Sequence, residues 1–478
     1  MYLFKRHLFA ATALGFLLAT GCGTGGGEST NAAAQAEGVT PEALRAAVGD
    51  DDALRKFYEA RQWQSAWNEE AAGQLNATLA NAVRHGLDPK TFTDEAGRGG
   101  SAAEKEVART RAALNYANVL AHGRTDPAKL FEDYTVPRNQ VDVPAGLAQA
   151  VNEGKAVEWI EGLAPQDEEY RALGEAYAQQ LQATQQPQQP RQAQQGQGQQ
   201  GQAKQQPKAK AKQTPPQQQA PEVPRDRAVV LAVNLERRRW LPRQAEATRI
   251  DVNTAGSFLR YIRDNQVADQ RVVVNGEPGW ETPELGTPLF RLVANPDWTV
   301  PESIEKDELA RLSPAQLARR NIKRENGRMV QQPGPENALG LVKLDLRNDE
   351  AIYLHDTPSK AAFQQTERHL SHGCVRVSDA LGFARLIADH TGKREEFDRA
   401  LANPEKKTTF VDLGTEIPVR LLYHTAFLDN GRLVFAADAY GWDAKVAEAL
   451  GLRPTAASDA AQASAEAKRR DRGADIGP

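Results

Sequence analysis

Cysteine is nearly absent from this sequence. Of 478 residues only Cys22 and Cys374 are cysteines, and the eight histidines are dispersed. Structural zinc sites need several clustered cysteine or histidine ligands, which this pattern does not supply. A metal held by His355, His372 and Cys374 together is a weaker interpretation than a reactive thiol, so neither a metal nor another cofactor is expected.

A strong charge of one sign is also missing. The formal net charge is −4, so no polybasic surface indicates a nucleic-acid partner. The apolar run Leu8–Leu18 is too short to span a bilayer comfortably, and no other transmembrane segment is evident. What is present is 40% hydrophobic residues, enough for packed cores, in a chain long enough for two or three domains.

The first residues form a targeting segment. A basic pair, Lys5-Arg6, precedes the apolar run, and Ala19-Thr20-Gly21-Cys22 resembles a lipobox with Leu18 one place earlier than the preferred leucine. We expect residues 1–21 to be a signal peptide of the lipoprotein type and Cys22 to be lipidated, with an ordinary cleaved signal as the alternative. The protein would lie in the periplasm or cell envelope on a membrane anchor. Since no aspartate follows Cys22, the outer membrane is favoured over the inner.

Three segments have compositions that do not support a packed core. Residues 22–39 are expected to be a tether, residues 183–222 a Gln/Pro-rich disordered linker and residues 454–478 a disordered tail. The lysines of the linker give at most a weak electrostatic attraction, so a solvated linker is the better interpretation.

Residues 40–182 are predicted to form a helical domain. Thr40-Pro41-Glu42 combines a capping threonine with a first-turn proline. An apolar, aromatic face recurs at helical spacing, and His85-Gly86-Leu87-Asp88-Pro89 is a stop signal. Val107–Ala121 is a further candidate helix, ended by His122-Gly123. Because an aromatic stripe is more often core than ligand site, this domain is interpreted as a scaffold.

Residues 223–453 are predicted to form a β-rich domain, which makes the fold class α+β. Ala228–Leu235, Arg249–Asn253 and Arg271–Val274 are rich in Val and Ile, as strands are. Asn430-Gly431 favours a hairpin turn between strands over 419–427 and 433–437.

Two other parts of this domain have their own patterns. Ser378 is a candidate N-cap for a helix that reaches about His390, with Phe383, Leu386 and Ile387 facing inward. Residues 302–336 are charged and lack a strand pattern.

Residues 352–377 concentrate the reactive side chains. Ser371, His372 and Gly373 precede Cys374 directly, Arg376 follows it, and His355 lies upstream. A thiol becomes a useful nucleophile when a base such as imidazole takes its proton. The glycine allows a tight turn whose amides can face a developing oxyanion.

An isolated cysteine is most often a small buried hydrophobe, but this cluster would be an odd way to pack a core. With Cys22 lipidated, Cys374 also has no disulfide partner in a compartment that tends to pair cysteines. Cys374 is therefore predicted to be a nucleophile.

Several motifs resemble those of the L,D-transpeptidases, the cysteine enzymes that cross-link peptidoglycan. The residues that carry this resemblance are Asn337-Ala338-Leu339-Gly340, Tyr353-Leu354-His355-Asp356-Thr357-Pro358 and Ser371-His372-Gly373-Cys374-Val375-Arg376. The likeness is closer to the large, multidomain YcbB-like type of Gram-negative bacteria, which has a YkuD-type catalytic domain. It extends through Asn234–Pro242, Asn295–Pro301, Phe57-Tyr58 and Gly123–Pro127, and covers about residues 50–182 and 225–445.

The resemblance implies a helical scaffold domain and a mixed β-rich, YkuD-like catalytic domain, with residues 302–336 as a mobile cap. It also implies acyl transfer from a stem tetrapeptide to an amine, with release of D-Ala, formation of 3→3 cross-links and acylation by carbapenem-type β-lactams. The family usually carries a small peptidoglycan-binding domain near residues 183–222, where this chain has no room for one.

The resemblance and the local chemistry assign roles together. Cys374 would be the nucleophile and His355 the base, while the amides of Gly373 and Cys374 would bind the oxyanion. Ser371 and His372 would support the loop or orient substrate. Arg376 would bind a substrate carboxylate or brace the loop, and Tyr353 would line the site or, as a strand residue, belong to the core. The expected partners are peptidoglycan stem peptides and a membrane; the sequence leaves protein partners open.

Other functions stay open at this point. An L,D-carboxypeptidase, or an enzyme that attaches a protein to peptidoglycan, differs from a cross-linking enzyme only in its acceptor, which the sequence does not reveal. A non-catalytic envelope lipoprotein that holds peptidoglycan is the alternative from another class. Intact His355 and Cys374 argue against it.

Overall fold

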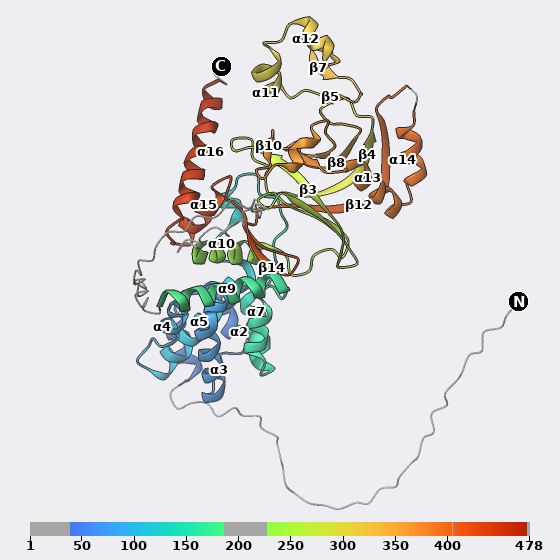
Figure 1. Ribbon diagram of the computed structural model, residues 1–478. Coiled ribbons are helices and arrows are strands. Elements are labelled where there is room, and N and C mark those ends of the chain that lie inside the picture. Colours follow the sequence, from blue (N-terminus) through green and yellow to red (C-terminus); the bar gives the residue numbers. More distant parts are fainter. Residues whose placement is uncertain (1–38, 186–226, 404, 476–478) are drawn as a thin grey trace, which may run out of the picture.

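The structure of the protein, a computed structural model, describes residues 39–185, 227–403 and 405–475. A helical part, a β-rich part and a small outer subdomain follow one another in space (Figure 1). The predicted signal peptide, Cys22, almost all of the tether and nearly the whole predicted linker lie outside the described residues. None of the described helices is both long and apolar enough to cross a membrane.

The helical part contains the predicted helices. Thr40 caps the first helix by accepting from Ala43 N, with Pro41 in the first turn, as predicted. The longest helix begins at a Ser101–Glu104 capping box and ends at Gly123. The elements are α1 (Pro41–Val48), α2 (Asp52–Ala60), α3 (Glu69–Ala80), η1 (Asn81–His85), α4 (Lys90–Ala96), α5 (Ala102–His122), α6 (Pro127–Leu130), α7 (Val143–Asn152), α8 (Ala156–Gly162) and α9 (Glu168–Gln185).

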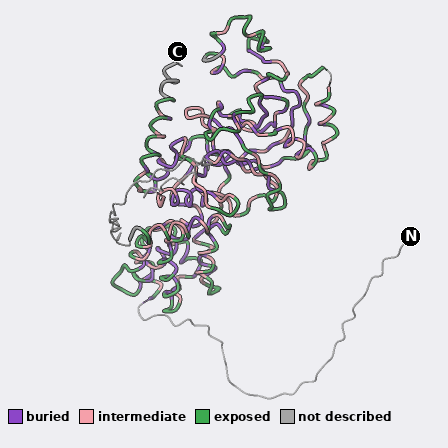
Figure 2. The backbone as a smooth tube through the Cα atoms, in the orientation of Figure 1, coloured by how far each residue is buried: buried purple, intermediate pink, exposed green. Residues whose placement is uncertain are grey.

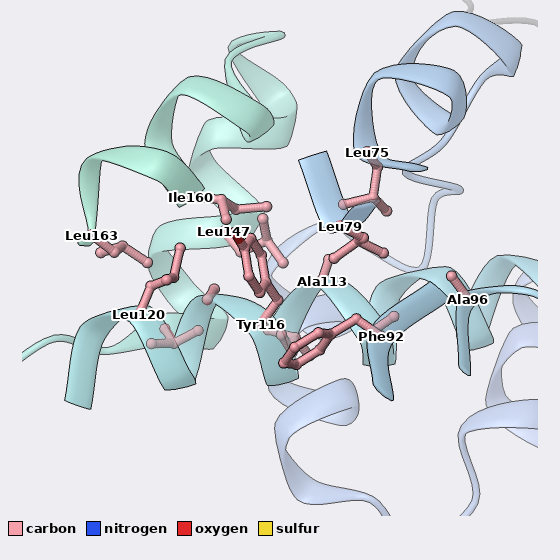
Figure 3. Packing of buried hydrophobic residues seen from close by; sticks show 14 of the residues in the cluster. Leu75, Leu79, Phe92, Ala96, Ala113, Tyr116, Leu120, Leu147, Ile160 and Leu163 are labelled. Atoms are coloured by element: carbon pink, nitrogen blue, oxygen red, sulfur yellow. The ribbon is translucent and has the colours of Figure 1, made fainter. Parts of the chain in front are cut away.

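The core of the helical part forms around α5. Small buried residues on this helix, such as Ala113 and Ala117, leave room for neighbouring helices to approach closely. Leu79, Phe92 and Leu147 close over Tyr116 from several helices (Figure 3). The aromatic stripe of the sequence, with Phe57, Tyr58 and Trp67, also belongs to this core, as predicted.

Helix α10 (Arg227–Trp240) overturns one prediction, because Ala228–Leu235 is helical and not a strand. A run of Val, Leu and Ala suits any element that is buried on several sides. This helix is such an element: Leu231 and Leu235 join the helical core, while Val233 and Trp240 join a separate cluster beside the sheet. Figure 2 shows it as buried along most of its length.

The β-rich part is a mixed sheet that closes on itself. Its strand order is β10-β3-β11-β9-β8-β4-β12-β1-β2, and a further pairing joins β2 to β3. The predicted strands Arg249–Asn253 and Arg271–Val274 are confirmed. The strands are β1 (Arg249–Asn253), β2 (Phe258–Arg263), β3 (Gln266–Gly276), β4 (Gly286–Ala294), β8 (Val342–Leu346), β9 (Leu354–His355), β10 (His369–Ser371), β11 (Val375–Val377) and β12 (Thr409–Leu422).

Helices α13 (Ala380–His390) and α14 (Arg394–Leu401) contribute Phe383, Ile387 and Phe397 to the core of this sheet. The predicted helix end at His390 is confirmed, but its N-cap is Asp379, which accepts from Gly382 N, and not Ser378. Ser378 N instead donates to Val272 O of β3 at 2.9 Å. A short helix, η3 (Lys360–Gln364), lies between β9 and β10.

The predicted Asn430-Gly431 turn is confirmed, with φ values of 49° and 72°. It joins β13 (Ala426–Asp429) to β14 (Arg432–Phe435). The strand predicted before this turn, over 419–427, is too long, since Val419–Leu422 belong to β12 and pair with β1.

Residues 298–331 form the outer subdomain, which we call the cap. It has a small core of Val300, Ile304, Leu309, Ile322 and Met329. The expectation that residues 302–336 lack strands is wrong, because an Asn326-Gly327 turn supports a hairpin there. The cap contains β5 (Trp298–Thr299), α11 (Glu302–Ile304), the π-helix η2 (Glu305–Leu309), α12 (Pro314–Arg319), β6 (Ile322–Glu325) and β7 (Arg328–Gln331).

The C-terminal region is helical and not a disordered tail as predicted. Helix α16 (Ala456–Asp475) packs on α15 (Trp442–Ala449), with Ala465 fully buried. Its alanines and charged residues suggested a disordered tail, yet alanine, glutamate and lysine are also strong helix formers. The close approach at Gly441, where a Cβ would meet Gln462 N at 2.1 Å, shows how tightly this helix docks.

Candidate active site

Strands β9 and β11 bring the predicted reactive residues together. They are parallel neighbours in which Val375 stands opposite Leu354, and Arg376 opposite His355. The residue before Val375 is Cys374, and its neighbour across the pair is Tyr353, whose carbonyl accepts from Val375 N at 3.1 Å. Two motifs that are separate in the sequence therefore form one site.

A tight turn, residues 371–374, presents the cysteine. Gly373 has φ of +104°, a value that L side chains rarely adopt, so the glycine is needed there. Two hydroxyl groups hold the turn: Ser371 Oγ donates to Cys374 O and Thr282 Oγ1 donates to Gly373 O, each at 2.6 Å. In the loops and turns that the structure describes, neither the Gly373 nor the Cys374 amide donates to a backbone carbonyl.

The thiol of Cys374 is half-buried and contacts two groups from the neighbouring chain segment. Its sulfur lies 3.6 Å from Ala351 O, and the Tyr353 hydroxyl is hydrogen-bonded to it. Burial raises the pKa of the thiol, while Tyr353 and the positive charges of Lys343 and Arg376 oppose that rise. At neutral pH the resting group is accordingly a thiol.

His355 is buried and held in one tautomer. Its Nδ1 is hydrogen-bonded to Asp356 O, and a carbonyl can only accept, so Nδ1 carries the proton and Nε2 is the basic nitrogen. Burial, the positive charge of Arg376 and more weakly the two lysines Lys343 and Lys360 lower the pKa of His355 to about 3. The imidazole is therefore neutral and able to accept a proton.

Asp356 stabilises the segment that holds the histidine. Its carboxylate accepts from Leu341 N at 3.0 Å and is paired with Lys360. The same carboxylate fills the space where Gly340 would carry a side chain, since a Cβ there would lie 2.3 Å from Asp356 Oδ2. Gly340, which the sequence marked as part of a motif, thus has an architectural role.

A cavity of about 410 Å³ opens over these residues. Six predicted site residues line it: Tyr353, His355, Ser371, His372, Cys374 and Arg376. Gly373 lies in the turn beneath. The opposite wall of the cavity belongs to the cap and includes Trp298, Ile304, Arg319 and Arg320. The predicted site residues in the described chain are therefore brought to one place.

Other residues of the site were not predicted from the sequence. Thr282 braces the turn from a remote loop, and the ring of Trp280 lies 5.3 Å from that of His372 in an edge-on contact. Of the two roles that the sequence leaves open for Tyr353, the structure shows the first, since it lines the cavity and contacts the sulfur. A threonine or tryptophan far from the motif carries no local signal, so only the structure reveals these contacts.

Among the residues that the structure describes, no group of three or more His, Cys, Asp or Glu side chains is arranged to hold a metal ion. The chemistry available at the site is that of a thiol, a neutral imidazole and two turn amides. This combination suits acyl transfer through a covalent thioester.

Comparison with known families agrees with this geometry. Residues 247–418 match the L,D-transpeptidase catalytic domain called YkuD, and residues 52–176 match a scaffold domain. The chain carries a YkuD L,D-transpeptidase domain. The scaffold domain ahead of it matches the multidomain architecture of the YcbB-like enzymes, and the α+β fold class is confirmed.

One curated relative is a Haemophilus influenzae protein whose name assigns it to the L,D-transpeptidases. It is 30% identical over 239 residues, which cover 45% of this chain and 48% of the relative. The chain therefore matches about half the length of that relative.

Two solved structures also match the YkuD-containing chain. The first is the Ldtfm–avibactam carbamoyl enzyme, which is 14% identical; the match covers 37% of this chain and 49% of the other, with a TM-score of 0.21. The second is a mutant of the Enterococcus faecium L,D-transpeptidase, also 14% identical; the match covers 37% of this chain and 50% of the other, with a TM-score of 0.19. At such scores nothing further is inferred from them.

Proposed function

We propose that this protein is a peptidoglycan L,D-transpeptidase that uses Cys374 as its nucleophile and His355 as its base. The observation that carries the proposal is the convergence, at one cavity, of a half-buried thiol and a neutral imidazole whose free nitrogen is Nε2. The YkuD domain supplies the reaction class.

In the first step the Cys374 sulfur attacks the carbonyl that joins a diamino acid to D-alanine in a stem tetrapeptide. The thiol proton passes to His355 Nε2 as the carbon–sulfur bond forms. The amides of Gly373 and Cys374 donate to the resulting oxyanion. The carbon–nitrogen bond then breaks, and D-alanine leaves with the proton from His355.

In the second step the side-chain amine of another stem attacks the thioester, His355 takes its proton and the thiol is restored. The product is a 3→3 cross-link. Arg319, Arg320 and Arg376, which line the cavity together, would bind the carboxylates of the stems. Ser371 stabilises the turn through its bond to Cys374 O and need not touch substrate.

The location of this chemistry follows from the sequence. A signal peptide of the lipoprotein type with lipidation at Cys22 would place the enzyme in the cell envelope, where its substrate lies. Labelling of the full chain with a fatty-acid analogue, lost in Cys22→Ala, would test the anchor. Labelling that survives the substitution would overturn it.

Intact-protein mass after incubation with a carbapenem tests the nucleophile. The wild type should gain one drug-sized increment, and Cys374→Ala should gain none. A folded wild type that gains no mass would contradict the proposal. Muropeptide analysis after incubation with a tetrapeptide substrate then identifies the acceptor: cross-linked dimers support the transpeptidase, and tripeptides alone indicate hydrolysis.

A further inference from the structure

A second cavity, of about 630 Å³, lies between the helical part and the sheet. The loop from α8 to α9 and the end of α10 form one side, and strands β1, β2 and β12 form the other. We call it the interdomain cavity. It shares no lining residue with the active-site cavity.

The strands turn a polar face toward this cavity. Successive side chains of a strand point to opposite faces. In β1, Ile250 and Val252 are buried in the sheet core, while Asp251 and Asn253 line the cavity. Strand β1 therefore gives this face a carboxylate and an amide, beside the apolar Ile262 of β2 and Leu422 of β12.

Among the residues that line the interdomain cavity, guanidinium groups outnumber carboxylates. Three carboxylates line it, those of Asp167, Glu169 and Asp251, against five guanidinium groups, those of Arg238, Arg243, Arg249, Arg260 and Arg420. Asp251 serves two of the arginines at once: Arg420 donates through Nε and Nη2 at 2.7 Å each, and Arg249 through Nε at 3.0 Å. Asp251 offsets one of the two charges, and the other is opposed only from outside the cavity lining, by the exposed Glu246 near Arg420.

Arg238 is paired with Asp167 and Glu169, and Arg260 lies 3.9 Å from Asp429 outside the lining. A further positive charge is that of Arg243. Within the described chain its hydrogen bonds go to backbone carbonyls, including Leu163 O and Leu120 O at 2.7 Å each, and none goes to a carboxylate. Burial lowers the pKa of Arg243 to about 10, so the group is still charged at neutral pH. A sheltered cleft with surplus positive charge favours an anionic occupant.

His424 adds a donor to the same wall. It is only 5% exposed, yet it lines the interdomain cavity. Arg238 Nη2 lies 3.4 Å from His424 Nδ1, and a guanidinium only donates, so the imidazole proton lies on Nε2. Burial and the nearby arginines hold the pKa of His424 well below its usual range, so the ring offers a neutral N–H.

The mouth of the cavity is apolar. Phe258 and Phe427 pack with ring centroids 5.0 Å apart, and Val267 beside them is 57% exposed. A single inorganic ion would use neither this patch nor the volume, which is in the range of sites for small organic ligands. The occupant should combine several carboxylates with small apolar groups.

We propose that the interdomain cavity binds a short acidic peptide with two or more carboxylates, separately from the active site. The source we assign, a peptidoglycan stem peptide, rests on the proposed function. Binding there would hold the polymer to the enzyme by a stem other than the one being processed.

Titration calorimetry on the carbapenem-acylated full chain tests this, because the acyl group fills the active site. The probe is a muropeptide with a stem tripeptide, which lacks the D-alanine leaving group. We expect one molecule to bind, more weakly at high salt. Val267→Glu, an exposed substitution at the mouth, should weaken binding about tenfold by repelling the carboxylates, whereas Val267→Lys should not weaken it.

Phe410→Glu is the matched control, because Phe410 is 56% exposed and does not line the interdomain cavity. It should bind the probe like the wild type. No binding to the acylated enzyme, or equal affinity in Val267→Glu and Phe410→Glu, would overturn the inference. If the carbapenem does not acylate the protein, the proposed function fails instead, and the same two variants are compared in a Cys374→Ala background.

Discussion

Two residues of the active site are held without charge. Burial raises the pKa of the Cys374 thiol and lowers the pKa of His355 to about 3. A resting thiolate–imidazolium pair would need both shifts reversed. We therefore expect the proton to move only while the sulfur attacks.

The pH dependence of acylation follows from this. His355 is neutral above its lowered pKa of about 3. The rate constant for carbapenem acylation should therefore stay level from about pH 8 to about pH 5, with no acid limb at the value near 6.5 of an ordinary histidine. Stopped-flow measurement across this range checks it. An acid limb centred near pH 6.5 would contradict it.

The charge of Arg376 contributes to that shift. Arg376→Gln should raise the pKa of His355 and move the acid limb to higher pH. Arg399→Gln removes an exposed arginine from α14 and should leave the profile unchanged. Equal profiles for the two variants would show that Arg376 does not act on the histidine.

Thr282 acts on the nucleophile through the turn. Its hydroxyl donates to Gly373 O and accepts from Gly276 N at 2.9 Å. Thr282→Val keeps the shape but leaves both groups unpaired, so acylation should slow about tenfold and stability fall by about 1–3 kcal/mol. Thr282→Ser should restore the acylation rate. A Val variant that is destabilised but acylates at the normal rate would make the role purely structural.

At the scale of elements, the confirmed predictions are those for elements determined by neighbouring residues in the sequence. Helix starts with a local cap, such as Thr40-Pro41, and the Asn430-Gly431 turn follow from neighbouring residues alone. Helix α10 was predicted as a strand because its burial comes from two distant partners, which local composition does not record. Helix α16 likewise depends on docking against α15.

The same distinction holds for the site. Cys374 and His355 stand in contiguous motifs, and parallel pairing of β9 with β11 brings them together. Thr282, Trp298 and the arginines of the cap reach the cavity through tertiary folding. No pattern in their own segments points to that cavity.

The contact between Gly340, in the loop before β8, and Asp356 can be tested against Gly327 as a matched control. Gly340 and Gly327 have φ of +61° and +81°, but a Cβ meets Asp356 only at Gly340 and nothing within 4 Å at Gly327. Gly327→Ala should cost about 1 kcal/mol of backbone strain. Gly340→Ala should cost at least about 3 kcal/mol and slow acylation, because Asp356 also holds His355. Denaturant unfolding and acylation rates check both variants; equal losses would contradict the contact.

For the whole molecule, α10 is the connection between the two parts. Glu236 accepts from Arg124 N and Thr125 N of the helical part at 2.6 and 2.7 Å, and is paired with Arg239. Arg237, fully buried, is paired with Asp443 of α15. Helix α10 is therefore joined to the helical part by the hydrogen bonds of Glu236 and to α15 by the ion pair of Arg237.

Glu236→Ala should therefore affect the whole protein. It removes the acceptor of two backbone donors and of the buried Arg239, at a cost of about 3–5 kcal/mol. Glu236→Gln keeps one acceptor oxygen and should cost less. Calorimetry should show the helical and catalytic transitions separating in the Ala variant. A single transition with a loss below about 1 kcal/mol would contradict this role.

The packing of α9 against α10 also determines the effect of a cut in the chain between them. Arg238 near the end of α10 pairs with Glu169 at the start of α9, so the two helices run antiparallel and their other ends, at residues 185 and 227, lie on the same side. Residues 186–226 are thus a connection between neighbouring ends of a packed helix pair. A protease that cuts within them would produce two fragments that stay associated through a buried interface. Co-expression of residues 39–185 with residues 227–478 should then reconstitute one complex.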